Sequence, residues 1–146
     1  MNSTEINTIE VDPGNPNVVV VATGDIASME GGGIYKTING GQSWQETYPD
    51  GGNYLTYYNG QLYAASYHAI LKSSNFGTTW QVIYQSPAIV TTMAIAGNGS
   101  TLFAGTFEYN YVSIIKSIDN GRNFRRIVES LVPEIINNPE KWITDI

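Results

Sequence analysis

The sequence predicts an all-β protein built from repeated four-stranded antiparallel sheets, and three observations support this. A nine-residue pattern occurs three times: Lys, Ser or Thr, any residue, Asp or Asn, any residue, Gly, two further residues and an aromatic. The aromatics Trp44, Trp80 and Phe124 lie 36 and then 44 residues apart, a period typical of propeller blades. Short apolar runs separated by Gly, Pro and Asn precede each copy, as expected for strands joined by tight turns.

Each position of the pattern has a predicted structural role. The Asp or Asn oxygen can accept backbone N–H bonds and fold the chain back, and the Gly can adopt the positive φ that the turn needs. The aromatic starts the returning strand and covers the base of the hairpin, burying on the order of 150–250 Å². The residues with these roles are Thr37, Asn39, Gly41 and Trp44 in the first copy, Ser73, Asn75, Gly77 and Trp80 in the second, and Ser117, Asp119, Gly121 and Phe124 in the third.

The rest of the chain divides into three blades of four strands each. Blade 1 covers about residues 5–50, blade 2 about 53–86 and blade 3 about 90–129. The predicted strands are 6–11, 18–22, 33–37 and 44–48 in blade 1, with a loop at 24–33; 54–58, 61–66, 69–73 and 80–84 in blade 2; and 91–95, 102–106, 111–117 and 124–128 in blade 3. The order of strands and turns is the same in all three blades.

Residues 130–141 are predicted to form a loop, and 142–146 to form the first strand of a further blade. Closed propellers use about 4–8 blades, so three blades and one strand would form only part of a ring. Three arrangements fit this reading. The ring is completed by further sequence, by pairing of copies with the last strand lodged in a neighbour, or the blades form a short open stack.

Composition narrows the classes of function. Charged residues make up only 14% of the chain and the formal net charge is −6, which argues against binding to a nucleic-acid backbone. No apolar run is long enough to span a membrane. No spacing of His, Asp or Glu indicates a metal site, and no Gly-rich phosphate loop is present, so we expect neither a metal nor a cofactor.

The repeated pattern resembles the Asp-box, or BNR repeat, whose consensus is Ser-x-Asp-x-Gly-x-Thr-Trp. The third copy keeps Ser117, Asp119 and Gly121 and has Phe124 in place of Trp, while the first two copies have Asn in place of Asp. The resemblance implies a β-propeller whose repeated hairpins join the third and fourth strands of each blade, away from the ligand-binding face. The family includes sialidases, xyloglucanase-like hydrolases, sortilin-type receptors and photosystem assembly factors, so it leaves the function open.

The sequence holds no complete catalytic set, and Asp25 is the one candidate catalytic carboxylate. The resemblance implies this role, because xyloglucanase-like hydrolases carry a catalytic Asp between the second and third strands of their first blade. A sialidase site is not expected, because Arg122, Arg125 and Arg126 lie on one hairpin and cannot surround a sugar from several blades. The single histidine, His68, has no nucleophile or carboxylate partner in the sequence.

A ligand-binding surface is predicted at the end of the blades opposite the repeated hairpins. The connections between second and third strands meet there, and the candidate residues on them are Asp25, Tyr67, His68, Phe107, Tyr109 and Tyr111. Tyr offers a flat apolar face and a hydroxyl, which suit a sugar ring or a protein interface.

Two functions follow as expectations. The first is a non-catalytic propeller module for binding or assembly, with a protein or glycan partner, located outside the cell or on a particle surface. The alternative is a fragment of a xyloglucanase-like glycoside hydrolase in which Asp25 supplies one carboxylate.

Overall fold

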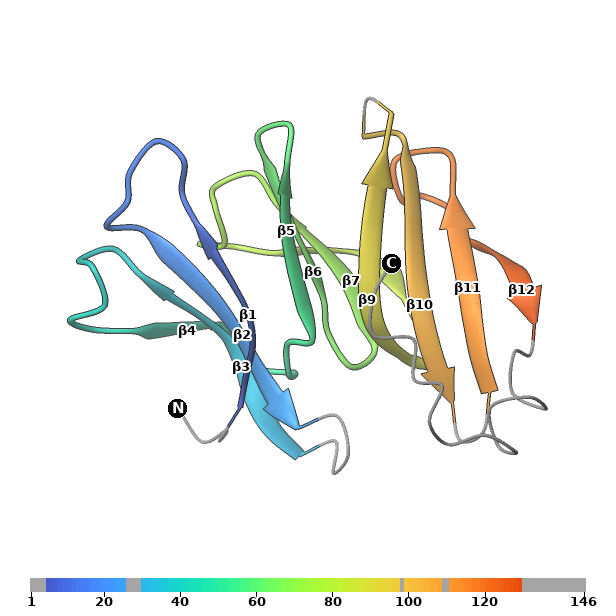
Figure 1. Ribbon diagram of the computed structural model, residues 1–146, viewed down its shortest axis with the longest axis horizontal. Helices are drawn as coiled ribbons and strands as arrows, with labels where there is room; N and C mark the ends of the chain where they lie inside the picture. The colour runs from blue at the N-terminus through green and yellow to red at the C-terminus, as the bar shows by residue number, and fades with distance from the viewer. Residues whose placement is uncertain (1–4, 26–29, 98, 109–110, 130–146) are drawn as a thin grey trace, which may run out of the picture.

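Three separate four-stranded antiparallel sheets make up the structure (Figure 1). The computed structural model describes residues 5–25, 30–97, 99–108 and 111–129, and within these ranges it contains strands and turns but no helix. Blade 1 contains β1 (Ile6–Val11), β2 (Val19–Asp25), β3 (Glu30–Thr37) and β4 (Gln45–Tyr48); blade 2 contains β5 (Tyr54–Tyr58), β6 (Gln61–Ala65), β7 (Ala69–Ser73) and β8 (Gln81–Gln85); blade 3 contains β9 (Ile89–Ala96), β10 (Thr101–Glu108), β11 (Tyr111–Ser117) and β12 (Arg125–Glu129). Strands follow one another in each sheet in chain order.

The blades pack face to face through two apolar cores, because each central strand is apolar on both sides. The first core joins blades 1 and 2 and contains Val20, Ile34, Leu62 and Leu71. The second joins blades 2 and 3 and contains Tyr63, Ala65, Ile70, Val90, Met93, Leu102, Ala104 and Ile115. Blade 2 is therefore covered on both faces, and β7 contributes Leu71 to one core and Ile70 to the other.

The first strand of each sheet lies closest to its neighbours, since β1 contacts β5 and β5 contacts β9. The outer strands β4 and β12 lie at opposite sides of the molecule, so the sheets fan out from the side where β1, β5 and β9 lie (Figure 1). The β3–β4, β7–β8 and β11–β12 hairpins lie at one end of the molecule. The carboxyl ends of β2, β6 and β10 and the starts of β3, β7 and β11 lie at the other (Figure 1). This is the arrangement of consecutive β-propeller blades, as the sequence predicted.

The predicted strand bounds are wrong in two places that bear on function. Residues 24–33 are not all loop, because β2 continues through Asp25 and β3 begins at Glu30, with the α-carbons of these two residues paired. Thr23 helps to extend the pairing, as its hydroxyl both donates to the Gly33 carbonyl and accepts from the Gly33 N–H, each at 3.1 Å. In blade 3, Phe107 belongs to β10 and not to the loop beyond it. Residues 130–141 and the predicted strand 142–146 lie outside the described residues.

The repeated pattern forms the same hydrogen-bonded turn three times. In blade 2 the Ser73 hydroxyl donates to Asn75 Oδ1 at 2.9 Å and accepts from the N–H groups of Asn75 and Gly77, at 3.3 and 2.8 Å. Asn75 Oδ1 also accepts from the Thr79 N–H at 2.9 Å. Equivalent bonds form around Thr37 and Asn39 in blade 1 and around Ser117 and Asp119 in blade 3.

The pattern glycines have the positive φ that the sequence predicted, at 90° for Gly41, 77° for Gly77 and 84° for Gly121. A side chain at these positions would be strained by the backbone conformation alone. The carboxamide or carboxylate oxygen accepts backbone bonds as expected. Thr37, Ser73 and Ser117 were predicted to be structural, but the bonds through which their hydroxyls tie the turn to the preceding strand were not predicted.

Candidate functional surfaces

Two regions have an organised geometry: the end where the second and third strands connect, and the seams where each hairpin meets the neighbouring blade. The first holds the residues that the sequence selected. Asp25 ends β2, Tyr67 and His68 form the β6–β7 connection, Phe107 lies near the end of β10, and Tyr111 begins β11. These strand ends and the β6–β7 connection lie at the same end of the molecule (Figure 1). Tyr109 lies outside the described residues.

Tyr67 joins the connections of blades 1 and 2. Its side chain is 4% exposed, and its hydroxyl donates to the Asp25 backbone carbonyl at 3.0 Å. A side chain on Gly24 or Gly51 would collide with the Tyr67 ring, so these glycines make room for it. Burial raises the pKa of the Tyr67 hydroxyl, and the nearby carboxylates of Asp25 and Asp50 raise it further. The hydroxyl therefore stays protonated and donating at neutral pH.

His68 and the aromatic residues of blade 3 are presented outward on supported backbone. The His68 carbonyl accepts from the Ser86 N–H at 2.8 Å and from the Gln85 side chain at 3.0 Å, while the imidazole is exposed. Phe107 is 38% exposed and Tyr111 59% exposed, at the ends of the paired strands β10 and β11. Exposed rings on a backbone fixed by hydrogen bonds lose little entropy when they bind a ligand.

The second region is the seam between one hairpin and the preceding blade. Lys36, on β3 of blade 1, donates to the Asn75 carbonyl at 3.1 Å and to Thr78 Oγ1 at 2.7 Å, both on the hairpin of blade 2. Burial at this seam lowers the pKa of Lys36, and the Asp12 carboxylate partly offsets the effect. The sequence analysis gave this Lys no role, although its recurrence as Lys36, Lys72 and Lys116 was the available signal.

The third and fourth strands of each blade pair with a one-residue register shift, and this shift supplies further contacts at the seam. It leaves Thr47, Ile83 and Ile127 outside the regular pairing of blades 1, 2 and 3. Thr47 accepts the indole N–H of Trp80 at 3.1 Å. Ile83 lies against Gly121, where an added Cβ would come within 2.6 Å of Ile83 Cδ1. The unpaired residue of one blade thus contacts the hairpin of the next.

Two of the pattern aromatics, Trp80 and Phe124, contact the preceding blade, in addition to their predicted role of covering the base of their own hairpin. The Phe124 ring lies 4.6 Å from that of Tyr84 in blade 2, and Trp80 bonds to blade 1 as described above. Trp44, whose seam would face a blade before blade 1, is 37% exposed. The prediction that each aromatic starts the returning strand is off by one residue, because the strands begin at Gln45, Gln81 and Arg125.

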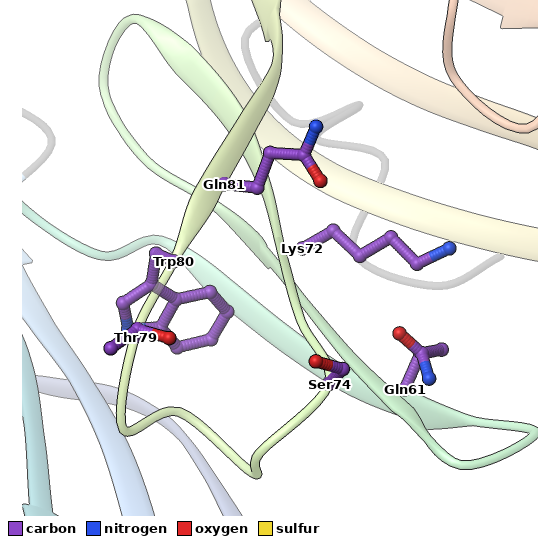
Figure 2. A pocket seen from close by; sticks show the side chains of 6 residues that line it. All are labelled: Gln61, Lys72, Ser74, Thr79, Trp80 and Gln81. Carbon is purple, nitrogen blue, oxygen red and sulfur yellow. The ribbon is translucent and has the colours of Figure 1, made fainter.

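Open depressions follow the hairpin end of blade 2. One, of about 300 Å³, is lined by Lys72 and Gln81 together with residues 120–122 of the blade 3 hairpin. A second of the same size lies beside it, and Figure 2 shows Lys72 and Gln81 extending the same way along it, with Trp80 set apart from them. The remaining lining residues of the second are Gln61, Ser74 and Thr79. Both depressions are shallow features of the seam and hold no cluster of carboxylates.

Within the described ranges, no three His, Cys, Asp or Glu side chains gather as a metal site would require. None of the described residues forms a helix that is long and apolar enough to cross a membrane.

Comparison with solved structures supports the propeller fold. An ancestral GH74 enzyme matches 87% of this chain with a TM-score of 0.64 and 17% sequence identity, and the match covers 18% of that enzyme. The structure of YCF48 bound to D1 peptide matches 90% of this chain with a TM-score of 0.61 and 17% identity, over 42% of that chain. A chain of the nidogen/laminin complex matches 79% with a TM-score of 0.56 and 12% identity, over 45% of that chain.

These relatives are β-propeller proteins, so the three sheets described above are propeller blades. The chain spans less than half the length of each of these three structures. No protein-family model matches the chain, and no curated protein does.

Proposed function

We propose that this chain is an Asp-box β-propeller module whose function is binding or assembly without catalysis. The hairpin geometry supports the Asp-box assignment: Ser117 and Asp119 bond to one another and to the turn backbone, and Gly121 has the positive φ that the turn requires. The Thr37–Asn39 and Ser73–Asn75 pairs make the same bonds, so Asn replaces Asp without loss of the turn.

The proposed ligand surface is the end that carries Asp25, His68, Phe107 and Tyr111. The observation that carries this proposal is the exposure of Phe107 and Tyr111 at this end. At the same end, the hydrogen bond from Tyr67 to the Asp25 carbonyl joins blade 2 to blade 1. Aromatic faces and polar tips suit a sugar ring or an extended peptide. YCF48, a similar propeller, has been solved with a bound peptide, which favours a protein partner as the first class to test.

A fragment of a xyloglucanase-like glycoside hydrolase is the second proposal. Two observations favour it: the match to an ancestral GH74 enzyme, and the position of Asp25 at the connection between the second and third strands of blade 1. Asp25 would supply one carboxylate, and a hydrolase needs a second one placed across the scissile bond.

The two functions can be separated with a panel of xyloglucan oligosaccharides, a glycan array and a peptide array. We expect binding without product formation. Tyr111→Ala and Phe107→Ala should each weaken binding by ~10-fold or more, since truncating an aromatic residue that anchors a binding interface commonly costs more than about 1 kcal/mol. Ile38→Ala is the matched control, because Ile38 is an exposed apolar residue on a hairpin at the opposite end.

Product formation from any oligosaccharide, abolished by Asp25→Asn, would contradict the binding module and support the hydrolase. Binding that Tyr111→Ala and Phe107→Ala leave unchanged would contradict the proposed surface while leaving the module intact.

We further propose that the protein works outside the cell or on a particle surface. The low fraction of charged residues, 14%, with polar uncharged residues in their place, is what supports this. Immunoblotting of secreted, particle and cell fractions from the natural source would test it.

A further inference from the structure

The outer faces of blades 1 and 3 have the same character as the faces that meet inside the molecule. In blades 2 and 3, we call the face that is turned toward the preceding blade the front face, and the opposite face the back face. In blade 1, the back face is the one that packs on blade 2, and the front face is the opposite one. Inside the molecule, back faces always meet front faces. Val20 and Lys36 on the back of blade 1 meet Leu62 and the hairpin of blade 2.

The front face of blade 1 carries apolar residues, and among the described residues neither of the other two sheets packs on it. The α-carbons of Ile9, Val21, Tyr35 and Glu46 are paired in one row across the four strands. Ile9 is 59% exposed. The equivalent positions on the front of blade 2 include Leu55, Ala64 and Leu71, all of which are buried against blade 1. The blade 1 face thus has the composition of a seam, with Val21 buried at 2% exposed and Ile9 beside it open to solvent.

The back face of blade 3 repeats the features of the internal back faces. Lys116 lies over the Phe103 ring at 5.1 Å, as Lys72 lies over the Tyr63 ring at 5.3 Å in blade 2. Lys36, the equivalent in blade 1, reaches the hairpin of the next blade, whereas Lys116 has no hydrogen bond among the described residues. Ile127, which the register shift leaves unpaired in blade 3, is exposed where Thr47 and Ile83 contact a hairpin.

Charge indicates what covers these faces. Arg125 on the back of blade 3 occupies the position held by the neutral Gln45 and Gln81 in blades 1 and 2. Glu46 on the front of blade 1 is exposed and occupies the position of Val82 in blade 2. Both charges lie on the outermost strand of their blade. The back of blade 3 and the front of blade 1 therefore carry opposite charges on their outermost strands.

We propose that a second copy of this chain packs head to tail on the first, with the back of blade 3 against the front of blade 1. Lys116 then donates to the hairpin of blade 1 around Asn39, and Ile127 lies against Gly41 and Trp44, as their counterparts do at the internal seams. Two copies present both contacts at once and form a six-bladed ring, which lies within the range of about 4–8 blades that close. This assembly does not depend on what the loop end binds.

The test is the mass of the 146-residue chain in solution, by light scattering and sedimentation at several protein concentrations. We expect a dimer with twice the chain mass of 16.0 kDa. Ile9→Glu on the front of blade 1 and Ile127→Glu on the back of blade 3 should each raise the dimer dissociation constant by ~100-fold or more, because each places a charge in an apolar seam. Circular dichroism and thermal melts check that both variants fold.

The matched control is Ile38→Glu. Ile38 belongs to the blade 1 hairpin, and its counterparts Ser74 and Ile118 stay exposed although the preceding blade is present, so this position lies outside the seams. Its charge should leave the dimer intact.

Mixing the two seam variants tests the head-to-tail geometry. Each variant retains the face that the other has lost, so the mixture should form a dimer through one intact seam although neither variant does so alone. A dimer of Ile127→Glu alone would show front-to-front pairing and overturn the proposal. So would a folded monomer of the unmodified chain, as expected if further blades of a longer chain cover these faces, or large open polymers, as expected if the contact forms but does not close.

Discussion

The Ser73 hydroxyl makes three of the hydrogen bonds that hold the blade 2 hairpin. It is buried, donates to Asn75 Oδ1 and accepts from two backbone N–H groups. Ser73→Ala would leave these buried donors without a partner, so we expect a loss of about 1–3 kcal/mol in the free energy of unfolding. Urea denaturation followed by circular dichroism measures this.

Ser74→Ala is the matched control, because the neighbouring Ser74 is exposed. It should change the free energy of unfolding by no more than about 0.5 kcal/mol. Equal effects of the two substitutions would mean that the hydroxyl bonds at Ser73 do not stabilise the turn.

Asp119 gives one of the three hairpins a dependence on pH. Hydrogen bonds from the Asn123 side chain and backbone, and from Ser117, lower the pKa of Asp119 from 3.8 to about 2. Because the folded-state pKa lies below the unfolded one, the carboxylate stabilises the fold fully above pH 3.8, and this contribution is lost as the pH falls through about 2. Melting temperatures measured between these two values should therefore fall more steeply in the natural chain than in Asp119→Asn.

Asn is the natural control at this position, since Asn39 and Asn75 make the equivalent turn without a charge. At neutral pH the Asp119→Asn variant should remain folded with its hairpin intact. If the two proteins show parallel melting curves across the acidic range, the carboxylate does not contribute in this way.

At the scale of the element, β7 is the strand on which both cores depend. Leu71 packs into the core shared with blade 1 and Ile70 into the core shared with blade 3, and both are fully buried. Leu71→Ala and Ile70→Ala should each lower the free energy of unfolding by about 2–5 kcal/mol, because each leaves a cavity between blades. Guanidinium titrations measure the loss.

Val82→Ala removes two methyl groups from β8 at a position that is 46% exposed, so it should cost less than about 1 kcal/mol. If Ile70→Ala were as mild as Val82→Ala, blade 3 would not be stabilised through its contact with β7.

The strands differ in how well the sequence predicts them. The bounds of β1, β5, β7 and β11 agree with the prediction, because apolar runs end there at turns rich in Gly, Asn or Pro. β3 begins earlier than predicted, since Glu30 pairs with Asp25 and Gly33 with Thr23 through the backbone, while the glycines of this segment show no alternation of side chains. Strand pairing that involves glycine backbone alone cannot be predicted from the alternation of apolar and polar side chains.

For the whole molecule, the sequence predicts blades and their order but not how the blades contact one another. The hairpin glycines, the turn oxygens and the shared end of Asp25, His68, Phe107 and Tyr111 follow from local spacing. The seam contacts of Lys36, Thr47 and Trp80 join residues 33–42 positions apart and depend on the register shift in each blade. A one-residue shift cannot be read from composition or periodicity.

The chain that leaves blade 1 passes over that blade before it builds the next one. The Gly52 N–H donates to the Thr23 carbonyl at 2.8 Å, and its own carbonyl accepts from the Asn7 side chain at 2.8 Å. A Cβ on Gly52 would come within 2.6 Å of the Ala22 side chain, so only glycine fits there. Blade 1 therefore lacks two of its hydrogen bonds until Gly52 has been synthesised and has left the ribosome. Because synthesis runs from the amino terminus, we expect blade 1 to make these last bonds only after the segment that leads into blade 2 has been synthesised.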